Sequence, residues 1–179
     1  MTAQPPWAMP TPWNNQDIVL YHGTLDHHAQ DILSNGVSLA GANPDADFGP
    51  GFYTTTLRRQ AEAWAFVKVA EATADGKSHS PGLVEFTASR DSLAALDCLW
   101  FVRDEFDAVD FWSLVFHCRT GHPDHRRPPG TGLYDTVVGP MAAFWRQRVA
   151  LQGYDQISFH TPNAITFLNA DPKRWKRIR

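Results

Sequence analysis

The chain has 179 residues, of which 43% are hydrophobic and 20% are charged, so the sequence is typical of one globular domain and not of a disordered segment. Its formal net charge of −3 argues against a protein whose main task is to coat nucleic acid. The two cysteines, Cys98 and Cys118, give neither a disulfide framework nor a zinc-binding spacing. The sequence shows no secretory signal and no membrane-length apolar run, so we expect a cytoplasmic protein without a membrane partner.

The N-terminal half of the sequence predicts strands and helices in alternation. We expect an irregular arm over residues 1–16, which are rich in proline and tryptophan and show no periodicity. The run "DIVLYH" predicts a strand over 17–22, and "GFYTTT" predicts a second strand over 51–56. Helices are expected over 25–36 and, where apolar residues recur at three- and four-residue spacing, over 57–72.

The C-terminal half predicts three more strands and three more helices. The strands are expected over 82–87, 133–139 and 155–160, and the helices over 107–119, 140–151 and 162–168. The two kinds of element mix without regular βαβ alternation and without a glycine-rich phosphate loop, so the expected fold class is α+β. We expect a single domain over 17–170, followed by a basic tail over 171–179.

Small and polar residues gather at the ends of predicted strands. The first strand ends in His22, Gly23 and Thr24, the second contains Gly51, Phe52, Tyr53 and Thr54, and the last contains Gln156. Trp64 follows Tyr53 by eleven residues, on the predicted helix. Each has an ordinary interpretation, with the aromatic residues in the core and Gln156 as a polar residue of an edge strand.

Together these residue types also fit a pocket for a flat ring that carries an amide. A glycine lets such a ring approach the main chain, whose N–H and C=O groups can pair with a carboxamide. The aromatic faces of Tyr53 and Trp64 can hold the ring between them. His22 and Thr24 can form hydrogen bonds with the hydroxyl groups of a sugar. The pattern therefore describes a pocket for nicotinamide and its ribose.

Four blocks of sequence resemble a known superfamily. The order of "LYHGT", "DFGPGFYTTT…QAEAWA", "YDTVVGPMA" and "DQISFHTPNAITFLN" resembles the diphtheria-toxin-like, His-Tyr-Glu branch of the ADP-ribosyltransferases. More narrowly, the blocks resemble a bacterial family of ADP-ribosyltransferase-like domains of unknown function. The resemblance runs from about Val19 to Leu168. It implies a split, curved antiparallel β core with flanking helices, NAD+ as the substrate, and no metal.

The resemblance also implies roles for individual residues. His22, Tyr53 and Gln156 take the positions of the catalytic triad, and the main chain of Gly23 pairs with the nicotinamide carboxamide. Ala61 stands where many relatives have a serine that bonds the same carboxamide. The other residues expected around the cofactor are Thr24, Gly51, Phe52, Thr54 and Trp64. We expect His22, Tyr53 and Gln156 to converge in one cleft.

Gln156 departs from the family, which has a glutamate at this position. A glutamine keeps the hydrogen-bonding geometry but carries no charge, and loss of one group that stabilises a transition state costs roughly 10²- to 10³-fold in rate. Three interpretations follow. The enzyme works with Gln156, or the neighbouring Asp155 supplies the charge although it points to the opposite strand face, or the domain binds NAD+ without catalysis.

The expected function is an NAD+-dependent mono-ADP-ribosyltransferase that modifies an intracellular protein or nucleic acid. The resemblance implies a bacterial toxin or effector, with an antitoxin or immunity protein as a partner. The alternatives are an NAD+ glycohydrolase, an inactive NAD+- or ADP-ribose-binding module, and a histidine-dependent ribonuclease. No metal site is expected, because His27 and His28 point about 100° apart on a helix.

Overall fold

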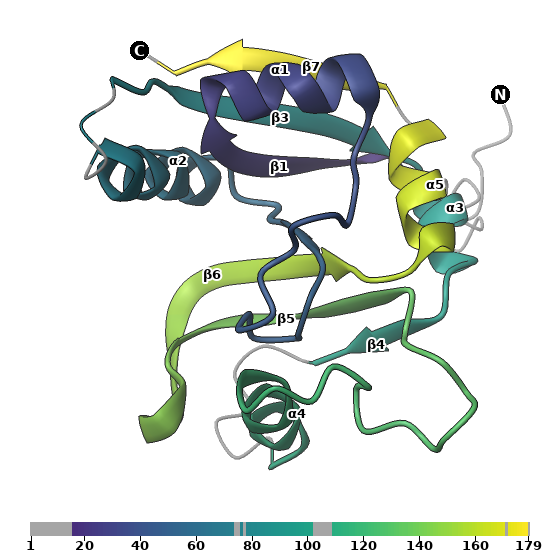
Figure 1. Cartoon of the computed structure of the whole chain (residues 1–179). Helices are drawn as coiled ribbons and strands as arrows, with labels where there is room; N and C mark the ends of the chain where they lie inside the picture. The colour runs from purple at the N-terminus through teal and green to yellow at the C-terminus, as the bar shows by residue number, and fades with distance from the viewer. Residues whose placement is uncertain (1–15, 74–75, 77, 102–108, 171, 179) are drawn as a thin grey trace, which may run out of the picture.

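The computed structural model describes residues 16–73, 76, 78–101, 109–170 and 172–178, and its architecture is of the α+β class (Figure 1). The predicted arm over 1–16 lies outside these residues except for Gln16. One sheet has the strand order β1–β3–β7, formed by Ile18–Leu25, Pro81–Ala88 and Lys173–Arg177. A second sheet has the order β2–β6–β5–β4, formed by Phe52–Thr54, Val149–Phe159, Thr136–Phe144 and Cys98–Trp100.

Most neighbouring strands run antiparallel. This holds for β1 with β3, β3 with β7, β2 with β6, and β5 with β6, whereas the short β4 runs parallel to β5. A 3-10 turn at Trp145–Gln147 joins β5 to β6, and the register of this pair shifts after Pro140 and again after Ala142. The hairpin extends well beyond β2, as Figure 1 shows at the lower left.

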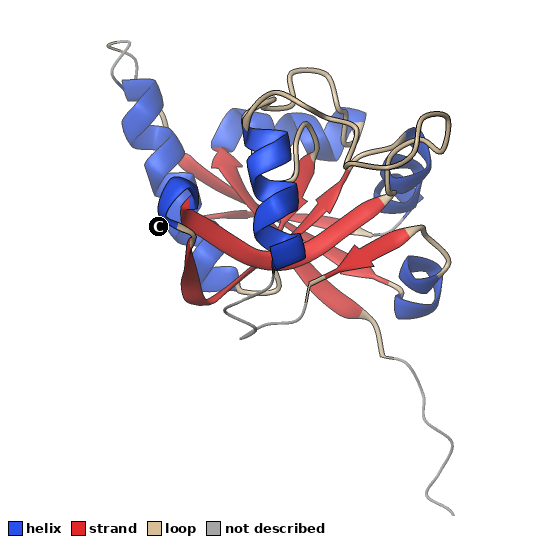
Figure 2. Ribbon diagram, turned by 90° about the horizontal axis from the view of Figure 1, so that it is seen from below, coloured by secondary structure: helices blue, strands red, loops and turns tan. Residues whose placement is uncertain are grey.

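The helices lie around the two sheets (Figure 2). α1 (Asp26–Asn35) and α2 (Arg58–Thr73) pack on the first sheet, and α4 (Val109–Arg119) covers the second. α3 (Arg90–Ala94) and α5 (Pro162–Ala170) contribute buried residues to the apolar cluster that lies between the two sheets. A Cβ atom on Gly82 would lie 2.9 Å from the Cβ of Ala29, so a glycine lets α1 approach β3 this closely.

The buried apolar side chains form two clusters. The first lies between the sheets and contains Leu20, Val84 and Phe86 of one sheet with Phe52, Ile157 and Phe159 of the other. The second lies between the second sheet and α4, and its fully buried members include Phe48 of the loop before β2, Val115 and Val137. β2 serves both clusters, because alternate residues of a strand point to opposite faces. Phe52 enters the first cluster and Tyr53 packs against the second.

The structure corrects two sequence-based predictions. The helix expected over 140–151 is wrong, because β5 continues to Phe144 and β6 already begins at Val149. The basic tail expected over 171–179 contains β7, which pairs with β3. α3 and β4 were not predicted. Within the described part of the chain, no helix is both long and apolar enough to cross a membrane.

Candidate functional site

The two sheets meet at an isolated backbone bridge. The amide of Tyr21 donates to the carbonyl of Thr55 at 2.8 Å, and the amide of Thr55 donates to the carbonyl of Tyr21 at 2.9 Å. Beyond this bridge β1 and β2 do not pair in either sheet. In an extended strand residues two apart direct their N–H and C=O groups to the same edge. The polar main-chain groups of Gly23 therefore point to the same open edge of β1 as those of Tyr21.

His22 spans the gap between these two strands. Its Nδ1 lies 2.7 Å from the carbonyl oxygen of Tyr53, and its ring stacks on that of Phe52 with centroids 4.3 Å apart. Burial lowers the pKa of His22 to about 4, so the ring is neutral at pH 7. A carbonyl can only accept, so Nδ1 carries the proton and Nε2 is an acceptor. No hydrogen bond to Nε2 is found among the described residues.

Gly23 lies against helix α2. A Cβ atom at this position would come within 1.8 Å of the carbonyl oxygen of Ala61 and 3.0 Å of the amide nitrogen of Ala65. The glycine therefore allows a close contact between helix and strand, and the ring approach predicted from the sequence stays a prediction. Trp64, on the same side of α2, remains 41% exposed with the Nζ of Lys68 5.0 Å from its ring centroid.

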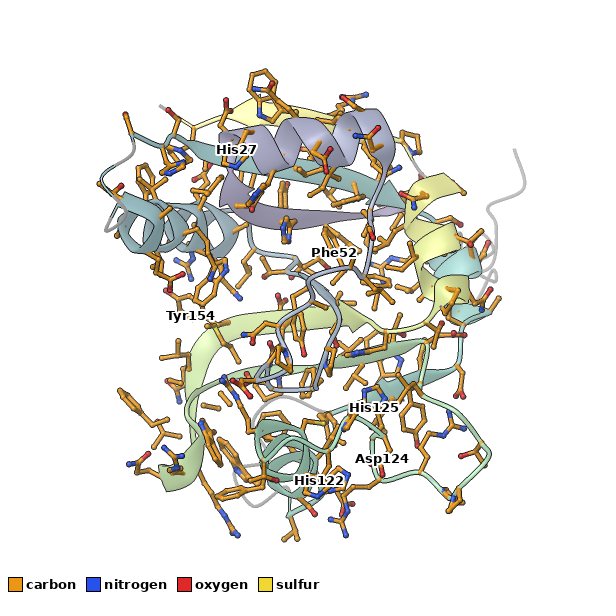
Figure 3. The ribbon with its side chains drawn as sticks, in the orientation of Figure 1. His27, Phe52, His122, Asp124, His125 and Tyr154 are labelled. Atoms are coloured by element: carbon orange, nitrogen blue, oxygen red, sulfur yellow. The ribbon has the colours of Figure 1, made fainter. Side chains whose placement is uncertain are left out.

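Three further predicted residues lie around this junction. The hydroxyl of Thr54 is buried and donates to the carbonyl of Ile157 at 3.1 Å, so its role in the sheet is structural. Phe52 belongs to the core between the sheets (Figure 3). Thr24 is only 8% exposed, and no hydrogen bond of its hydroxyl is found among the described residues. Thr24 is therefore a buried polar group for which the described residues show no partner.

Tyr53 holds the loop that precedes β2. Its hydroxyl accepts a hydrogen bond from the amide of Phe48 at 3.0 Å and donates one to the carbonyl of Gly49 at 2.7 Å. Burial raises the pKa of Tyr53 well above its usual value, so the phenol stays protonated. The edge of its ring faces His160, whose centroid lies 6.1 Å away. Both hydroxyl contacts are structural, which leaves the ring as the part able to contact a substrate.

Gly51 makes room for His160 rather than for a ligand. A Cβ atom on Gly51 would lie 2.7 Å from the imidazole of His160. The Nδ1 of this buried histidine bonds the carbonyl of Pro50 at 2.8 Å, and its Nε2 lies 2.7 Å from the hydroxyl of Ser158. Burial lowers the pKa of His160 to about 3. The pair Ser158 and His160 therefore fastens the loop to β6.

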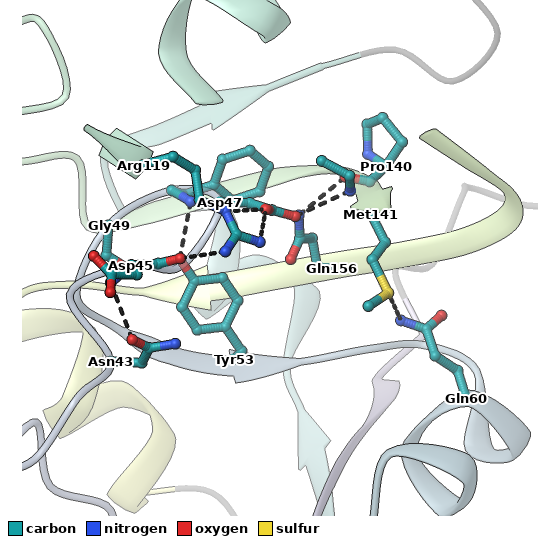
Figure 4. Close-up of polar contacts among 12 residues, drawn as sticks. Asn43, Asp45, Asp47, Gly49, Tyr53, Gln60, Arg119, Pro140, Met141 and Gln156 are labelled. Carbon is teal, nitrogen blue, oxygen red and sulfur yellow. Dashed lines mark hydrogen bonds and ion pairs between the residues drawn. The ribbon is translucent and has the colours of Figure 1, made fainter. Parts of the chain in front are cut away.

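Gln156 is buried and held by two acceptors. Its Nε2 donates to the Oδ2 of Asp47 at 2.8 Å and to the carbonyl of Pro140 at 3.0 Å (Figure 4). The orientation of the amide is therefore fixed, since only the NH₂ group can serve two acceptors. The other arm of the amide, Oε1, has no hydrogen bond among the described residues. Asp47 and Arg119, which pairs with it, are site residues that the sequence analysis missed.

The alternative carboxylate, Asp155, points to the opposite face of β6. Its Oδ1 accepts a hydrogen bond from the amide of Thr56 at 2.9 Å, and the hydroxyls of Thr55 and Thr56 also donate to the carboxylate. The side-chain amide of Gln60 bonds both main-chain groups of Asp155. Asp155 therefore anchors the beginning of α2, and the interpretation that it supplies the charge missing at Gln156 is not supported by its position.

The predicted triad comes together only in part. His22 contacts the main chain of Tyr53, and Tyr53 shares a face of the second sheet with Gln156, since Tyr53 is opposite Ser158. The ring of His22 instead stacks on that of Phe52, which belongs to the core cluster between the sheets. No contact joins the side chains of His22 and Gln156. The three residues thus line a junction along the sheet edge rather than surround one point.

A pocket of about 590 Å³ lies beside this junction, on the other side of the strands. The residues next to His22 and Gln156 in the sequence line this pocket. Because successive side chains of a strand point to opposite faces, those of His22 and Gln156 do not line it. Its lining includes Tyr21, Thr56, Arg90, Trp100, Asp155 and Ile157. Among the described residues no group of three or more His, Cys, Asp or Glu side chains could hold a metal ion.

Comparison with known proteins gives a family but no curated relative. A search among curated proteins finds none that matches the chain. A protein-family model with the description "Protein of unknown function (DUF3990)" matches residues 18–146, which include β1, the loop that carries Asp47, β2 and α2. The match ends before Gln156 and covers more than half of the sequence. The chain therefore belongs to the family described as a protein of unknown function, DUF3990.

Proposed function

We propose that the protein is an NAD+-dependent mono-ADP-ribosyltransferase that modifies an intracellular macromolecule, as a bacterial toxin or effector does. The observation that carries this proposal is the open edge of β1 beside β2. There, His22 is fixed by its bond to Tyr53, and the main-chain N–H and C=O groups of Gly23 face the side where no strand pairs with β1. An N–H beside a C=O is the pattern that pairs with a carboxamide.

The polar groups left without partners near this edge fit the remaining parts of a nicotinamide riboside. The acceptor Nε2 of His22 suits a ribose hydroxyl, and the buried hydroxyl of Thr24 can either donate or accept. The exposed indole of Trp64 offers an aromatic face to the pyridinium ring. Gln156 leaves only its Oε1 without a hydrogen bond among the described residues, as an acceptor for a second ribose hydroxyl.

The reaction proposed for this site is a substitution at the nicotinamide ribose carbon of NAD+. The C–N glycosidic bond breaks and its electron pair leaves with neutral nicotinamide. An oxygen or nitrogen atom of the acceptor bonds the same carbon and loses its proton to the solvent. The acceptor is a protein or a nucleic acid, and an antitoxin or immunity protein is the expected partner of a toxin of this kind. A cytoplasmic site of action follows from the substrate.

A second candidate function is an NAD+- or ADP-ribose-binding module without catalysis, with NAD+ hydrolysis as a third. The neutral side chain of Gln156 favours the binding module. A carboxylate gains free energy as positive charge develops on the ribose, and an amide gains much less. The two enzymatic functions differ only in whether water or a macromolecule takes the ADP-ribosyl group.

Release of nicotinamide from NAD+ by the purified protein, with and without cell lysate, tests the proposal. We expect release that depends on lysate. His22→Asn keeps a donor for the Tyr53 carbonyl but removes the Nε2 acceptor, so release should fall roughly 10²-fold. His27→Asn, on the exposed surface of α1, is the matched control and should retain activity.

The other outcomes separate the candidate functions. Release without lysate would identify the glycohydrolase. Binding of NAD+ in calorimetry without release would identify the binding module. A protein that neither binds NAD+ nor releases nicotinamide would contradict the proposal altogether.

A further inference from the structure

Asp47 places a buried carboxylate directly against Gln156. The residue lies in the loop between α1 and β2 and is 4% exposed. Its Oδ2 accepts hydrogen bonds from the amide of Ala142 at 3.0 Å and from the Nε2 of Gln156 at 2.8 Å. Its Oδ1 receives the Nε of Arg119 at 2.9 Å and the Nη2 of Arg119 at 2.5 Å. All four partners are donors, which is the full capacity of an ionised carboxylate.

Arg119 holds Asp47 in this position. The guanidinium comes from the last turn of α4, pairs with the carboxylate in a two-nitrogen contact, and also donates to the main-chain carbonyl of Asp45. The planar, rigid fork of an arginine defines the position of a carboxylate better than a lysine does. A chain of hydrogen bonds thus joins three elements, from Arg119 of α4 through Asp47 of the loop to Gln156 of β6 (Figure 4).

From this arrangement we propose that Asp47 is a positioning residue of the site, and that it works through Gln156. The inference rests on the function proposed above. The two hydrogen atoms of the Gln156 amide are taken by Asp47 and by the carbonyl of Pro140, so the Oε1 is the only atom of the amide left to face a ligand. A hydrogen bond to an ionised acceptor also polarises the amide and makes this oxygen a better acceptor.

The same geometry explains why a glutamate does not fit at position 156 beside Asp47. A carboxylate has no N–H for either partner and would lie within hydrogen-bond distance of a second carboxylate and a carbonyl oxygen. An exchange of the two side-chain types removes the conflict between the two carboxylates, whereas the hydrogen bond to the Pro140 carbonyl is not restored. With Asn at 47 and Glu at 156, one residue again donates, the other accepts, and the charge of the three-residue set with Arg119 is unchanged.

Four proteins test the inference: wild type, Asp47→Asn, Gln156→Glu and the double variant, each as the full chain. We measure the melting temperature and the kcat and KM for nicotinamide release in the presence of lysate. Each single variant should lower kcat by roughly 10²-fold, because the amide or carboxylate at 156 is no longer held. The double variant should recover both kcat and melting temperature above either single variant. Asp45→Asn, an exposed carboxylate two residues away, is the matched control and should behave as wild type.

The outcomes distinguish this inference from the proposed function. Wild type that releases nicotinamide, with an Asp47→Asn variant of equal kcat or a double variant worse than both singles, would overturn the role of Asp47 alone. Wild type that neither binds NAD+ nor releases nicotinamide would overturn the proposed function and the positioning role of Asp47 with it. If a single variant does not fold, Arg119→Lys loosens Asp47 without removing charge. That variant should lower kcat and leave KM unchanged, and an unchanged kcat would contradict the inference.

Discussion

Three histidines around the junction are kept neutral by burial. The pKa of His22 is lowered to about 4 and that of His160 to about 3, and the pKa of His125 is lowered too. His125 bonds the carbonyl of Phe48 and the amide of Tyr134, and its ring lies 4.4 Å from that of His160. The three rings act as neutral connectors of loops and strands, and protonation would place a positive charge on a buried ring.

We therefore expect stability to fall as the solution becomes acidic. The unfolded chain binds a proton at His160 near pH 6.5, but the folded chain does so only near pH 3. The stabilisation is present above pH 6.5 and is lost as the pH falls towards 3, by an amount on the order of 4 kcal/mol for this residue. Melting temperatures of wild type and His160→Gln between pH 3 and pH 8 measure it. The variant should show a flatter profile, whereas the exposed His27→Gln should keep the wild-type profile.

At the scale of residues, the sequence predicts some of the candidate site residues but not the distant side chains that they contact. The sequence predicts His22, Gly23 and Tyr53 as site residues because a histidine, a glycine and an aromatic residue at strand ends form a recognisable pattern, and their role stays a prediction. Asp47 precedes the glycine-rich turn directly, but nothing in its sequence position shows that Arg119 and Gln156 reach it. Those contacts span 72 and 109 positions of the chain and arise only from the packing of α4 and β6.

At the scale of elements, the segment between α1 and β2 is held by side chains from distant parts of the chain. Phe48 is fully buried, and the hydroxyl of Tyr53, the imidazole of His125 and the imidazole of His160 each bond a main-chain group of this segment. A loop with so many anchors behaves as a fixed part of the site. Its position depends on interactions that single substitutions can remove.

Tyr53→Phe should loosen this loop and leave the sheet intact. The change leaves the buried amide of Phe48 and the carbonyl of Gly49 without a partner, which costs about 1–3 kcal/mol of unfolding free energy. Amide hydrogen exchange should be faster at residues 48–49 and unchanged in β3. Tyr154→Phe is the control, because no hydrogen bond of that hydroxyl is found among the described residues. Equal exchange rates in both variants would show that the phenol does not hold the loop.

Element prediction failed where pairing overrides local preference. The segment after Pro140 is rich in Ala, Met, Gln and Arg, which favour a helix, yet it forms the end of β5 and the return to β6. β7 reads as a charged tail because four of its five residues are Lys or Arg, a composition that also protects an exposed sheet edge. The long helix α2 and the apolar strand β3 were predicted correctly, since residues that favour a helix fill the first and apolar residues fill the second.

At the scale of the molecule, the fold is of the α+β class, and the first sheet ends with the strand β7. β7 pairs with β3 along the edge of the first sheet, and Lys176 of β7 forms an ion pair with Glu85 of β3 at 2.6 Å. The indole Nε1 of Trp175 donates to Asp26 of α1 at 3.1 Å. The sequence predicted the fold class but not the pairing of β7 with β3, because a strand of charged residues has no apolar pattern.

A chain that ends at Ala170 should therefore be less stable than wild type, contrary to the behaviour of a free tail. Loss of β7 exposes the backbone groups of β3, which then form an open edge for another chain. We expect a lower melting temperature and association that rises with protein concentration, measured by light scattering. A chain that ends at Arg177 keeps β7 and should match wild type. Equal stability of the shorter chain would show that β7 does not contribute.

The pairing of β2 with β6 also sets when the site can exist during synthesis. His22, Asp47 and Tyr53 leave the ribosome before β6, which pairs with the strand of Tyr53 and begins only at Val149. At about 5–20 residues per second the ribosome needs roughly 5–20 seconds to make the intervening hundred or so residues. A nascent or prematurely terminated chain therefore contains the first sequence motifs without the junction they form. The translating cell meets a complete site only after the ribosome has passed β6.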